Sequence, residues 1–354
     1  MLVIMAAVAL MFTAFFAPRL VVRDATFQGP FAQGQLAGVG AASPAADAQG
    51  NALYTGTIHH IFFHSLIVYP EKAFDPANKK RDLYRDYMIT RDQFQKILPQ
   101  LYAKGYMLVD VHDIYSVGAD GQVSRKNLYL PLGKKPLILS IDDVSYYQDQ
   151  YGGGLARRLV LEKSGKVATE IAAPDGTVSV TRDGDIVPIL DDFVQGHPDF
   201  SLNGAKGILA LTGYDGILGY RVGDTESARP VVDRLKAAGW SFASHSYTHG
   251  HGFLDGTISL ADLKADTEQW KREVMPVLGD TDVFVGPFGQ IFRPGDPRRA
   301  YLVSQGFKML CGVGMDDYLA YFKGYVVQDR ADIDGYRIAH DPQMLRQYFG
   351  AAAL

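Results

Sequence analysis

Trp240-Ser-Phe-Ala-Ser-His-Ser-Tyr-Thr-His249 joins an apolar run to two histidines four residues apart. The run from Trp240 to Ala243 predicts a short buried strand. If the backbone turns after that strand, the imidazoles of His245 and His249 come within reach of one cation. A divalent metal also needs an anionic ligand and an open position for water, which two neutral imidazoles do not provide. The stretch therefore predicts a metal site whose carboxylate comes from elsewhere in the chain.

A second histidine pair, His60 and His64, has the same spacing and tests this interpretation. The residues between them are continuously apolar and predict a strand, in which four residues span roughly 13 Å, so these two imidazoles cannot share an ion. The spacing of His245 and His249 is therefore informative only if a turn follows their strand. The alternative is a pair of structural histidines satisfied by hydrogen bonds.

The composition is typical of a folded protein with one large α/β domain or two smaller domains. The chain has 354 residues, and 47% of them are hydrophobic, which is enough for a sizeable core. A net charge of −4 and the lack of a dense Lys/Arg block argue against nucleic acid as a partner. The single cysteine, Cys311, excludes an intrachain disulfide and lies in an apolar stretch typical of a core.

The N-terminal residues predict an export segment followed by a tether. Leu2 to Ala17 is almost unbroken apolar sequence, which suits a signal peptide or a signal anchor; the alternative is a buried core helix. Much of 23–53 is rich in Gly, Ala and Gln without periodicity and predicts a flexible linker. We therefore expect a signal or anchor over 1–22, a linker over 23–53 and a folded domain over 54–354. The protein would be exported, and either anchored in the membrane or secreted.

Strand and helix patterns alternate through the folded part, which predicts a mainly parallel α/β sheet or barrel. The expected strands are 57–68, 106–111, 136–141, 207–211, 240–243, 283–285, 308–311 and 336–339, and the expected helices are 90–104, 229–238, 262–278 and 297–305. Between residues 155 and 206 the pattern changes to alternating segments separated by Ser-Gly and Asp-Gly turns. This change predicts a β-ribbon insertion.

Residues capable of chemistry follow five of the expected strands. They are Asp142-Asp143, Thr212–Asp215, His245–His249, Pro287-Phe288 and His340. In α/β folds functional side chains collect at the carboxyl ends of strands, so we expect these residues to converge. Adjacent carboxylates are costly unless a cation or a proton separates their charges. One aspartate can therefore bind the metal while its neighbour accepts a proton from water; the alternative is a pair of helix N-caps.

These residues resemble the motifs of the polysaccharide deacetylases, the NodB-like family 4 carbohydrate esterases. Ser140-Ile-Asp-Asp143 is similar to the family's Thr-Phe-Asp-Asp, and His245-Ser-Tyr-Thr-His249 matches its His-Ser/Thr-x-x-His. Val285-Gly-Pro-Phe-Gly289 matches Arg-x-Pro-Tyr-Gly in part, and Ile338-Ala-His340 is similar to the final Leu-x-His. Weaker similarity extends over most of the chain from Ile58 onwards.

The resemblance implies a deformed (β/α) barrel and metal-dependent removal of acetyl groups from a glycan. It implies zinc or a similar divalent ion bound by Asp143, His245 and His249, with Asp142 as general base, His340 as general acid and the backbone N–H of Phe288 at the oxyanion. For His340 the alternative is a cap on a helix or turn. A general acid is needed because an amine leaves an amide only when it is protonated.

The chain departs from the family pattern in ways that affect the base. The motif arginine that pairs with the catalytic aspartate is replaced by Val285, and Arg221 or Arg293 would have to substitute for it in space. The residue after the aspartate pair is Val144 where the family has glycine, and Phe288 lacks the hydroxyl of the family's tyrosine. Metal binding is therefore better supported than turnover.

The expected function is a metal-dependent hydrolase that removes N-acetyl groups from a cell-envelope or extracellular polysaccharide containing N-acetylhexosamine. The expected substrate contacts are Pro287 and Phe288, by resemblance, and Tyr214, whose ring can stack on a sugar. Two alternatives stay open. One is a metal-binding, glycan-recognition protein with weakened catalysis, and the other is a different metallohydrolase such as an O-acetyl esterase.

Overall fold

The computed structural model describes residues 46–314 and 318–354. The export segment expected over 1–22, and the expected linker as far as residue 45, lie outside this part of the chain. Regular structure begins before residue 54, because β1 (Ala52–Leu53) pairs antiparallel with β6 (Tyr129–Leu130). Within the described residues, none of the helices has the length and apolar character needed to cross a membrane.

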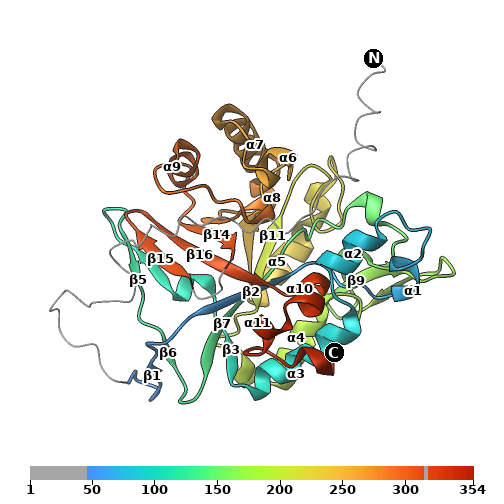
Figure 1. Ribbon diagram of the computed structural model, residues 1–354, viewed down its shortest axis with the longest axis horizontal. Coiled ribbons are helices and arrows are strands. Elements are labelled where there is room, and N and C mark those ends of the chain that lie inside the picture. The colour runs from blue at the N-terminus through green and yellow to red at the C-terminus, as the bar shows by residue number, and fades with distance from the viewer. Residues whose placement is uncertain (1–45, 315–317) are drawn as a thin grey trace. The chain divides into compact units, whose positions relative to one another are not determined.

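Seven parallel strands close into a barrel (Figure 1). In spatial order they are β7 (Lys135–Ile141), β11 (Gly207–Leu211), β12 (Trp240–Ser244), β13 (Val283–Val285), β14 (Met309–Val313), β16 (Tyr325–Asp332) and β2 (His59–Phe63). Pairing of β11 with β7 closes the ring, and β15 (Leu319–Phe322) runs antiparallel beside β16. The expected (β/α) barrel is confirmed.

The barrel is deformed where β7 meets two strands along one edge. β3 (Tyr106–Leu108) pairs with the first residues of β7, Lys135 to Leu137, whereas β11 pairs with Ser140 and Ile141 near its end. β2 pairs along the other edge of β7. β3 therefore separates β7 from β11 at the amino end of the barrel, and direct strand pairing closes the carboxyl end.

Alternation along the strands separates a barrel interior from an outer face. In β7, Ile138 joins a buried cluster with residues of five other barrel strands, whereas its neighbour Leu139 joins the cluster beneath the helices. Cys311 of β14 lies in the interior cluster and is fully buried. This agrees with the expectation of a core cysteine.

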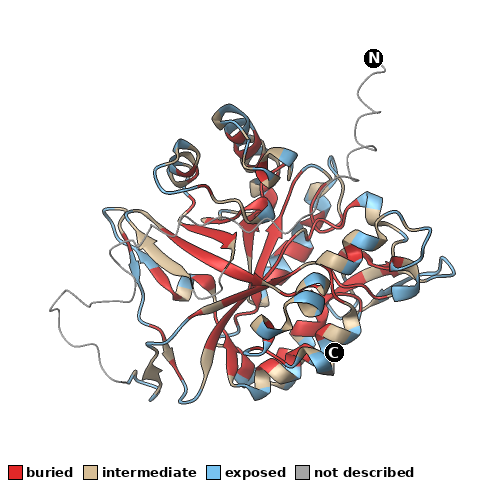
Figure 2. Ribbon diagram, viewed as in Figure 1, coloured by how far each residue is buried: buried red, intermediate tan, exposed pale blue. Residues whose placement is uncertain are grey.

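Helices cover the outer face of the barrel, and their buried sides point inward (Figure 2). The longer ones are α3 (Arg91–Ala103), α4 (Ile186–Gly196), α5 (Arg229–Ala237), α7 (Leu260–Glu273) and α9 (Pro297–Ser304). In α3, Thr90 and Gln93 form a capping box, and four apolar residues at helical spacing are buried. The shorter elements are α1 (Pro70–Ala73), α2 (Arg81–Tyr87), α6 (His251–Leu254), α8 (Met275–Leu278), α10 (Gly335–His340), α11 (Pro342–Leu345), β4 (Tyr115–Val117) and β5 (Val123–Arg125).

The expected β-ribbon is a three-stranded antiparallel sheet. Its strands are β8 (Ala156–Leu161), β9 (Val167–Ala172) and β10 (Val178–Thr181). The ribbon occupies the first half of the expected insertion over 155–206. The second half contains α4, whose buried residues join the hydrophobic cluster between the barrel and its helices. α4 therefore belongs to the crossover from β7 to β11.

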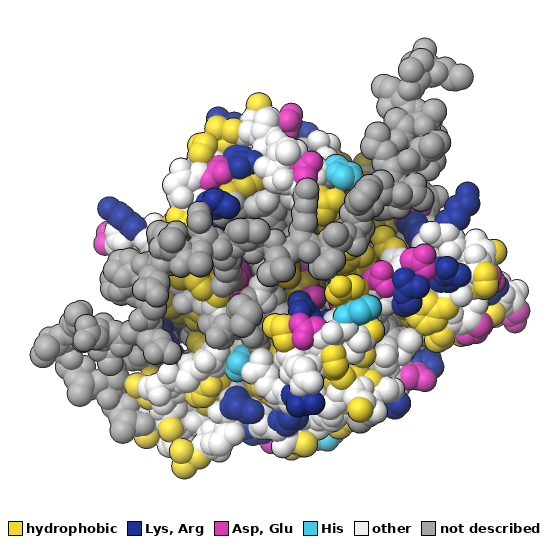
Figure 3. Space-filling model, in the orientation of Figure 1, with side chains coloured by type: hydrophobic (Ala, Val, Ile, Leu, Met, Phe, Trp, Pro, Cys, Tyr) yellow, Lys and Arg dark blue, Asp and Glu magenta, His cyan; other side chains and the backbone are white. Residues whose placement is uncertain are grey.

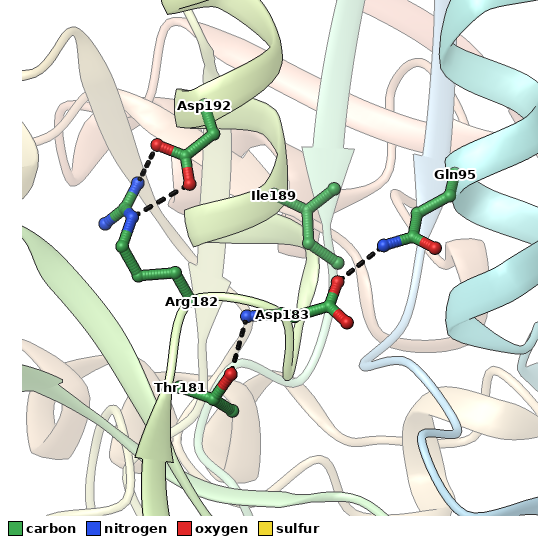
Figure 4. Close-up of a pocket in the computed structure, with 6 residues that line it drawn as sticks. All are labelled: Gln95, Thr181, Arg182, Asp183, Ile189 and Asp192. Atoms are coloured by element: carbon green, nitrogen blue, oxygen red, sulfur yellow. Dashed lines mark hydrogen bonds and ion pairs between the residues drawn. The ribbon is translucent and has the colours of Figure 1, made fainter.

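Polar contacts attach the ribbon to the helices beside it (Figure 4). Arg182, directly after β10, donates to the carboxylate of Asp192 in α4 at 2.9 and 2.6 Å. Asp183 accepts a hydrogen bond from Gln95 of α3 at 2.5 Å. These residues line a hollow whose charged groups pair with one another. The hollow contains none of the expected site residues.

One expectation near the C-terminus is wrong, and one strand is absent from the expected set. Residues 336–339, expected as a strand, belong to α10, which begins after Asp334 because that side chain accepts the backbone N–H of Arg337 at 2.7 Å. The last barrel strand is instead β16, which the sequence analysis missed. Polar and charged residues, among them Gln328 and Arg330, interrupt its apolar pattern.

Candidate metal centre

Asp142 and Asp143 leave the carboxyl end of β7 in different conformations. Asp142 continues the strand, since its backbone N–H donates to the carbonyl of Phe63 in β2 at 2.8 Å. Asp143 has a φ of 59°, in the left-handed region that residues other than glycine rarely adopt. The chain therefore turns between the two aspartates, and each carboxylate has its own set of partners.

The loop after β12 brings the two histidines together without forming a helix. Ser246 and His249 have left-handed φ angles of 60° and 49°, and the His249 N–H donates to Ser246 Oγ at 2.9 Å. Asp266 of α7 accepts the backbone N–H groups of Tyr247 and Thr248 at 2.7 and 2.9 Å. Left-handed conformations cost on the order of 1–3 kcal/mol each and persist where the surroundings enforce them. Here the two hydrogen bonds to Asp266 help to hold the loop in these conformations.

Asp143, His245 and His249 meet at the carboxyl end of the barrel. One ligand atom from each lies within 4.8 Å of the other two. His245 Nδ1 donates to the carbonyl of Val285 at 2.8 Å, so Nε2 carries the lone pair, and it lies 3.9 Å from Asp143 Oδ1. Nitrogen and oxygen ligands lie about 2.0–2.2 Å from zinc, so ligand atoms of one ion are on the order of 3–4 Å apart. The triad fits a divalent metal after small side-chain adjustments.

The charge states of the triad also suit a cation. Burial lowers the pKa of His249 to about 4, which leaves a neutral imidazole at physiological pH. Burial acts to raise the pKa of Asp143, but the neighbouring His249 and His245 outweigh it and hold the pKa below its ordinary value. A carboxylate with two imidazoles is a donor set of catalytic zinc sites that keep a position open for water.

Arg330 of β16 binds both oxygens of Asp142. Its Nη1 donates to Oδ1 at 2.7 Å and its Nη2 to Oδ2 at 2.9 Å, and both side chains are buried. Burial acts to raise the pKa of Asp142, but the Arg330 charge outweighs it and keeps the pKa well below its ordinary value. Arg221 and Arg293 are the two arginines expected to replace the absent motif arginine beside Asp142. Arg330 is the arginine that pairs with Asp142, whereas Arg221 pairs with Asp215 at 2.8 Å.

His340 was expected to follow a barrel strand, but it does not. It is the last residue of α10 and is exposed. Its Nδ1 lies 2.9 Å from the carbonyl oxygen of Tyr336, and its ring stacks on that of Tyr336 with centroids 4.3 Å apart. The histidine caps its own helix, which is the alternative that the sequence left open.

His64 is the histidine that lies beside Asp142 in the neighbouring strand. It follows β2 directly, and the register that pairs Phe63 with the last residue of β7 places it level with Asp142. Its imidazole is near enough to interact electrostatically with Asp142, Asp143 and His249. From the sequence, His64 is excluded as a partner of His60 in a metal site, and its place beside Asp142 is not predicted.

Aromatic side chains border the triad. Tyr147 donates its hydroxyl to Asp143 Oδ1 at 2.5 Å, and its ring stacks on Tyr214 with centroids 5.1 Å apart. The ring of Phe288 lies against His249, with centroids 4.3 Å apart. Tyr214 is 46% exposed and Phe288 is 47% exposed, so both rings face solvent near the triad.

Pro287 differs from the other two expected substrate contacts. It begins the 3₁₀ turn Pro287–Gly289 and is buried. Within this turn Phe288 has a φ of 54°, and Gly289 follows with a φ of 77°. Pro287 therefore shapes the turn that exposes Phe288 and is itself buried.

The sequence matches no family model and no curated protein. Among solved structures, similar chains include the deacetylase PplD of Streptococcus pyogenes in complex with acetate, at 13% identity and a TM-score of 0.44, with 78% of this chain and 93% of that chain covered. IcaB from Ammonifex degensii is 14% identical with a TM-score of 0.46, and the match covers 84% of this chain and 97% of that one. The deacetylase domain of BpsB from Bordetella bronchiseptica is 14% identical with a TM-score of 0.36, covering 78% and 97%.

Identities and TM-scores this low do not transfer an activity, so the chemistry has to be judged from the side chains. The described residues combine a closed parallel barrel with an Asp-His-His triad at its carboxyl end and a paired aspartate beside the triad. In its motifs and in its parallel barrel, the chain resembles the polysaccharide deacetylases.

Proposed function

We propose that the protein is a metal-dependent hydrolase that removes N-acetyl groups from a polysaccharide containing N-acetylhexosamine. The triad of Asp143, His245 and His249, with Asp142 beside it, carries this proposal. His245 Nε2 lies 3.9 Å from Asp143 Oδ1 and 4.0 Å from Asp142 Oδ2. A metal ligand and a proton acceptor therefore face the same point.

Zinc or a similar ion held by the triad would acidify a water molecule and polarise the acetyl carbonyl. Asp142 would accept the proton of the attacking water. Each carboxylate oxygen has two lone pairs, so the two hydrogen bonds from Arg330 leave one lone pair on each oxygen for that proton. Arg330 keeps the carboxylate ionised and fixed in orientation before the reaction.

His64 is our proposed general acid in place of His340. Cleavage of an amide needs a proton on the leaving nitrogen, and a histidine beside the base can supply it. His64 and Asp142 come from neighbouring strands, β2 and β7, whereas both ligand histidines follow β12. The proton donor and the metal ligands are thus on separate elements.

The exposed rings of Tyr214 and Phe288 support a sugar substrate. Tyr214 follows β11 and Phe288 follows β13, the two strands that flank β12 in the barrel. Aromatic faces at such positions can pack on the apolar faces of sugar rings. The alternative of a glycan-binding protein with weakened catalysis rests on the absent motif arginine together with the β-ribbon insertion, and the contact of Arg330 with Asp142 weakens the first of these reasons.

We also propose that the protein is exported and acts on a cell-envelope or extracellular polysaccharide. The apolar sequence of residues 2–17, followed by a Gly/Ala-rich linker, supports a tethered or secreted domain. On the face drawn in Figure 3, Lys and Arg side chains alternate with Asp and Glu. Among the described side chains visible in that view, Lys and Arg form no continuous basic surface for nucleic acid.

Acetate release from N-acetylglucosamine oligomers and from peptidoglycan tests the proposal. We expect release with zinc, loss with a chelator and loss in Asp142→Asn, whereas the matched change Asp149→Asn, at an exposed aspartate a few residues along, leaves it intact. Tyr214→Ala should raise KM on oligomers more than it lowers kcat. Metal bound in stoichiometric amount without acetate release from any acetylated glycan or ester would overturn the proposal.

A further inference from the structure

A buried polar layer lies in the barrel directly below Asp142. His60 of β2, Ser140 of β7, and Gln328 and Arg330 of β16 are fully buried on three neighbouring strands. Two of these strands, β7 and β16, also carry residues of the buried hydrophobic cluster of the interior. Polar groups are costly in such a place unless they are hydrogen-bonded, and well-packed apolar residues would often be at least as stable. The layer therefore calls for an explanation other than stability.

Hydrogen bonds join the layer into a chain that ends on Asp142. Arg330 Nη1 donates to Ser140 Oγ at 3.0 Å as well as to Asp142 Oδ1 at 2.7 Å. Ser140 Oγ lies 3.0 Å from His60 Nε2, and His60 Nδ1 lies 3.2 Å from Gln328 Oε1. The Gln328 amide in turn donates to the carbonyl oxygen of Ile58, directly before β2, at 3.0 Å. The chain thus runs from the backbone to the base.

One arrangement of hydrogens satisfies every member of this chain. The Gln328 amide donates to the carbonyl of Ile58, so its oxygen faces His60 Nδ1. Nε2 of the neutral ring is then free to accept the hydroxyl hydrogen of Ser140, while Ser140 Oγ accepts from Arg330. The proton of the neutral imidazole is on Nδ1, where it donates to Gln328. Burial and the Arg330 charge lower the pKa of His60 well below its ordinary value, which agrees with a neutral ring.

We propose that His60 is a positioning residue for the general base Asp142, acting through Ser140 and Arg330; this rests on the function proposed above. The Arg330 guanidinium packs on Phe62 at 4.2 Å. Ser140 holds Nη1 on the side of the guanidinium that faces His60. His60 accepts the hydroxyl hydrogen of Ser140 and so keeps the serine oxygen directed at Arg330 Nη1. This contact fixes the rotation of the guanidinium, so that Nη1 and Nη2 both face the Asp142 carboxylate.

The test compares His60→Leu with His60→Gln in the zinc-loaded protein. Leucine removes the acceptor, whereas the side-chain oxygen of glutamine can still accept the Ser140 hydroxyl. We expect kcat to fall on the order of 10- to 100-fold in His60→Leu, the range found for outer hydrogen-bond partners of metal sites, with KM and zinc affinity unchanged. His60→Gln should recover most of the loss. His59→Leu, on the outer face of the same strand, is the matched control and should behave like wild type.

A second readout needs neither metal nor substrate. The side-chain ¹⁵N–H signals of Arg330, assigned with Arg330→Lys, should exchange slowly with solvent in wild type and His60→Gln and faster in His60→Leu. If His60→Leu does not fold, Ser140→Ala breaks the same link. A wild-type kcat in His60→Leu, a glutamine variant as impaired as the leucine variant, or unchanged Arg330 signals would overturn the inference. A wild-type protein that releases no acetate would refute only the proposed function, and the Arg330 signals would still decide this link.

Discussion

Asp266 accepts the backbone N–H of Tyr247 at 2.7 Å and so ties the loop between the two ligand histidines to α7, outside the barrel. Its second oxygen accepts the N–H and the hydroxyl of Thr248 at 2.9 and 2.6 Å. The carboxylate is 6% exposed. The position of His249 therefore depends on a residue that would contact neither metal nor substrate.

We expect Asp266→Asn to weaken zinc binding. An amide keeps one acceptor oxygen but presents an NH₂ group to Thr248, so a buried donor loses its partner at a cost of about 1–3 kcal/mol. The affinity for zinc should fall on the order of 10-fold or more, as for other outer partners of metal ligands. Competition with a chromophoric chelator measures this. Glu268→Gln, on the exposed side of α7, is the matched control, and equal affinities in both variants would contradict the role of Asp266.

Arg330 and Asp142 form a buried ion pair, so removing one partner should destabilise the fold more than removing both. Arg330→Met leaves an uncompensated buried carboxylate and should lower the free energy of unfolding by about 3–5 kcal/mol. Adding Asp142→Asn should restore part of that loss. Urea unfolding at neutral pH compares the two variants. A double variant no more stable than the single one would mean that the pair does not behave as a buried ion pair.

The barrel and the grouping of Asp143, His245 and His249 could be predicted because their signals are local. Each of β7, β11, β12 and β13 is a short apolar run, and a residue capable of chemistry follows each one. The spacing of His245 and His249 is likewise a feature of one loop. Such patterns need no knowledge of how distant segments meet.

Arg330 could not be predicted in the same way. Its strand, β16, places Val326, Gln328 and Arg330 in the barrel interior, and polar residues inside a barrel look like a loop in the sequence. The arginine reaches Asp142 only because the closed ring brings β16 and β7 to either side of β2. Val285, which holds the place of the motif arginine, packs in the barrel interior, and Arg330 from a different strand supplies the cation that pairs with Asp142.

His112 provides a test of pH dependence away from the metal centre. Its Nδ1 lies 2.6 Å from Asp110 Oδ1 and its Nε2 lies 2.9 Å from Asp282 Oδ1. Burial acts to lower the pKa of His112, but the two carboxylates outweigh it and raise the pKa to about 10. The folded pKa is above the ordinary value of 6.5, so this contribution to stability is complete below pH 6.5 and is lost as the pH rises through about 10.

The difference in free energy of unfolding between wild type and His112→Gln should therefore shrink from neutral pH towards pH 10. Chemical unfolding at several pH values measures it. His197→Gln is the control, because the ring nitrogen Nδ1 of His197 faces the carbonyl oxygen of Phe193 and no carboxylate bond is involved there. A difference for His112→Gln that stays constant over this range would show that His112 is not held charged by its two carboxylates.

His64 and His340 can be distinguished as general acid by the leaving group of the substrate. An amine must be protonated as it leaves, whereas a phenolate leaves an ester without help. We expect His64→Gln to lower kcat on N-acetylglucosamine oligomers by roughly 10²- to 10⁴-fold and to spare cleavage of 4-nitrophenyl acetate. His340→Gln should change neither rate, because that ring stacks on Tyr336 at the exposed end of α10. If His340→Gln instead lost amide cleavage while His64→Gln kept it, α10 would have to move its last residue into the site when substrate binds. Retained amide cleavage in both variants would mean that a group other than these two histidines protonates the leaving amine.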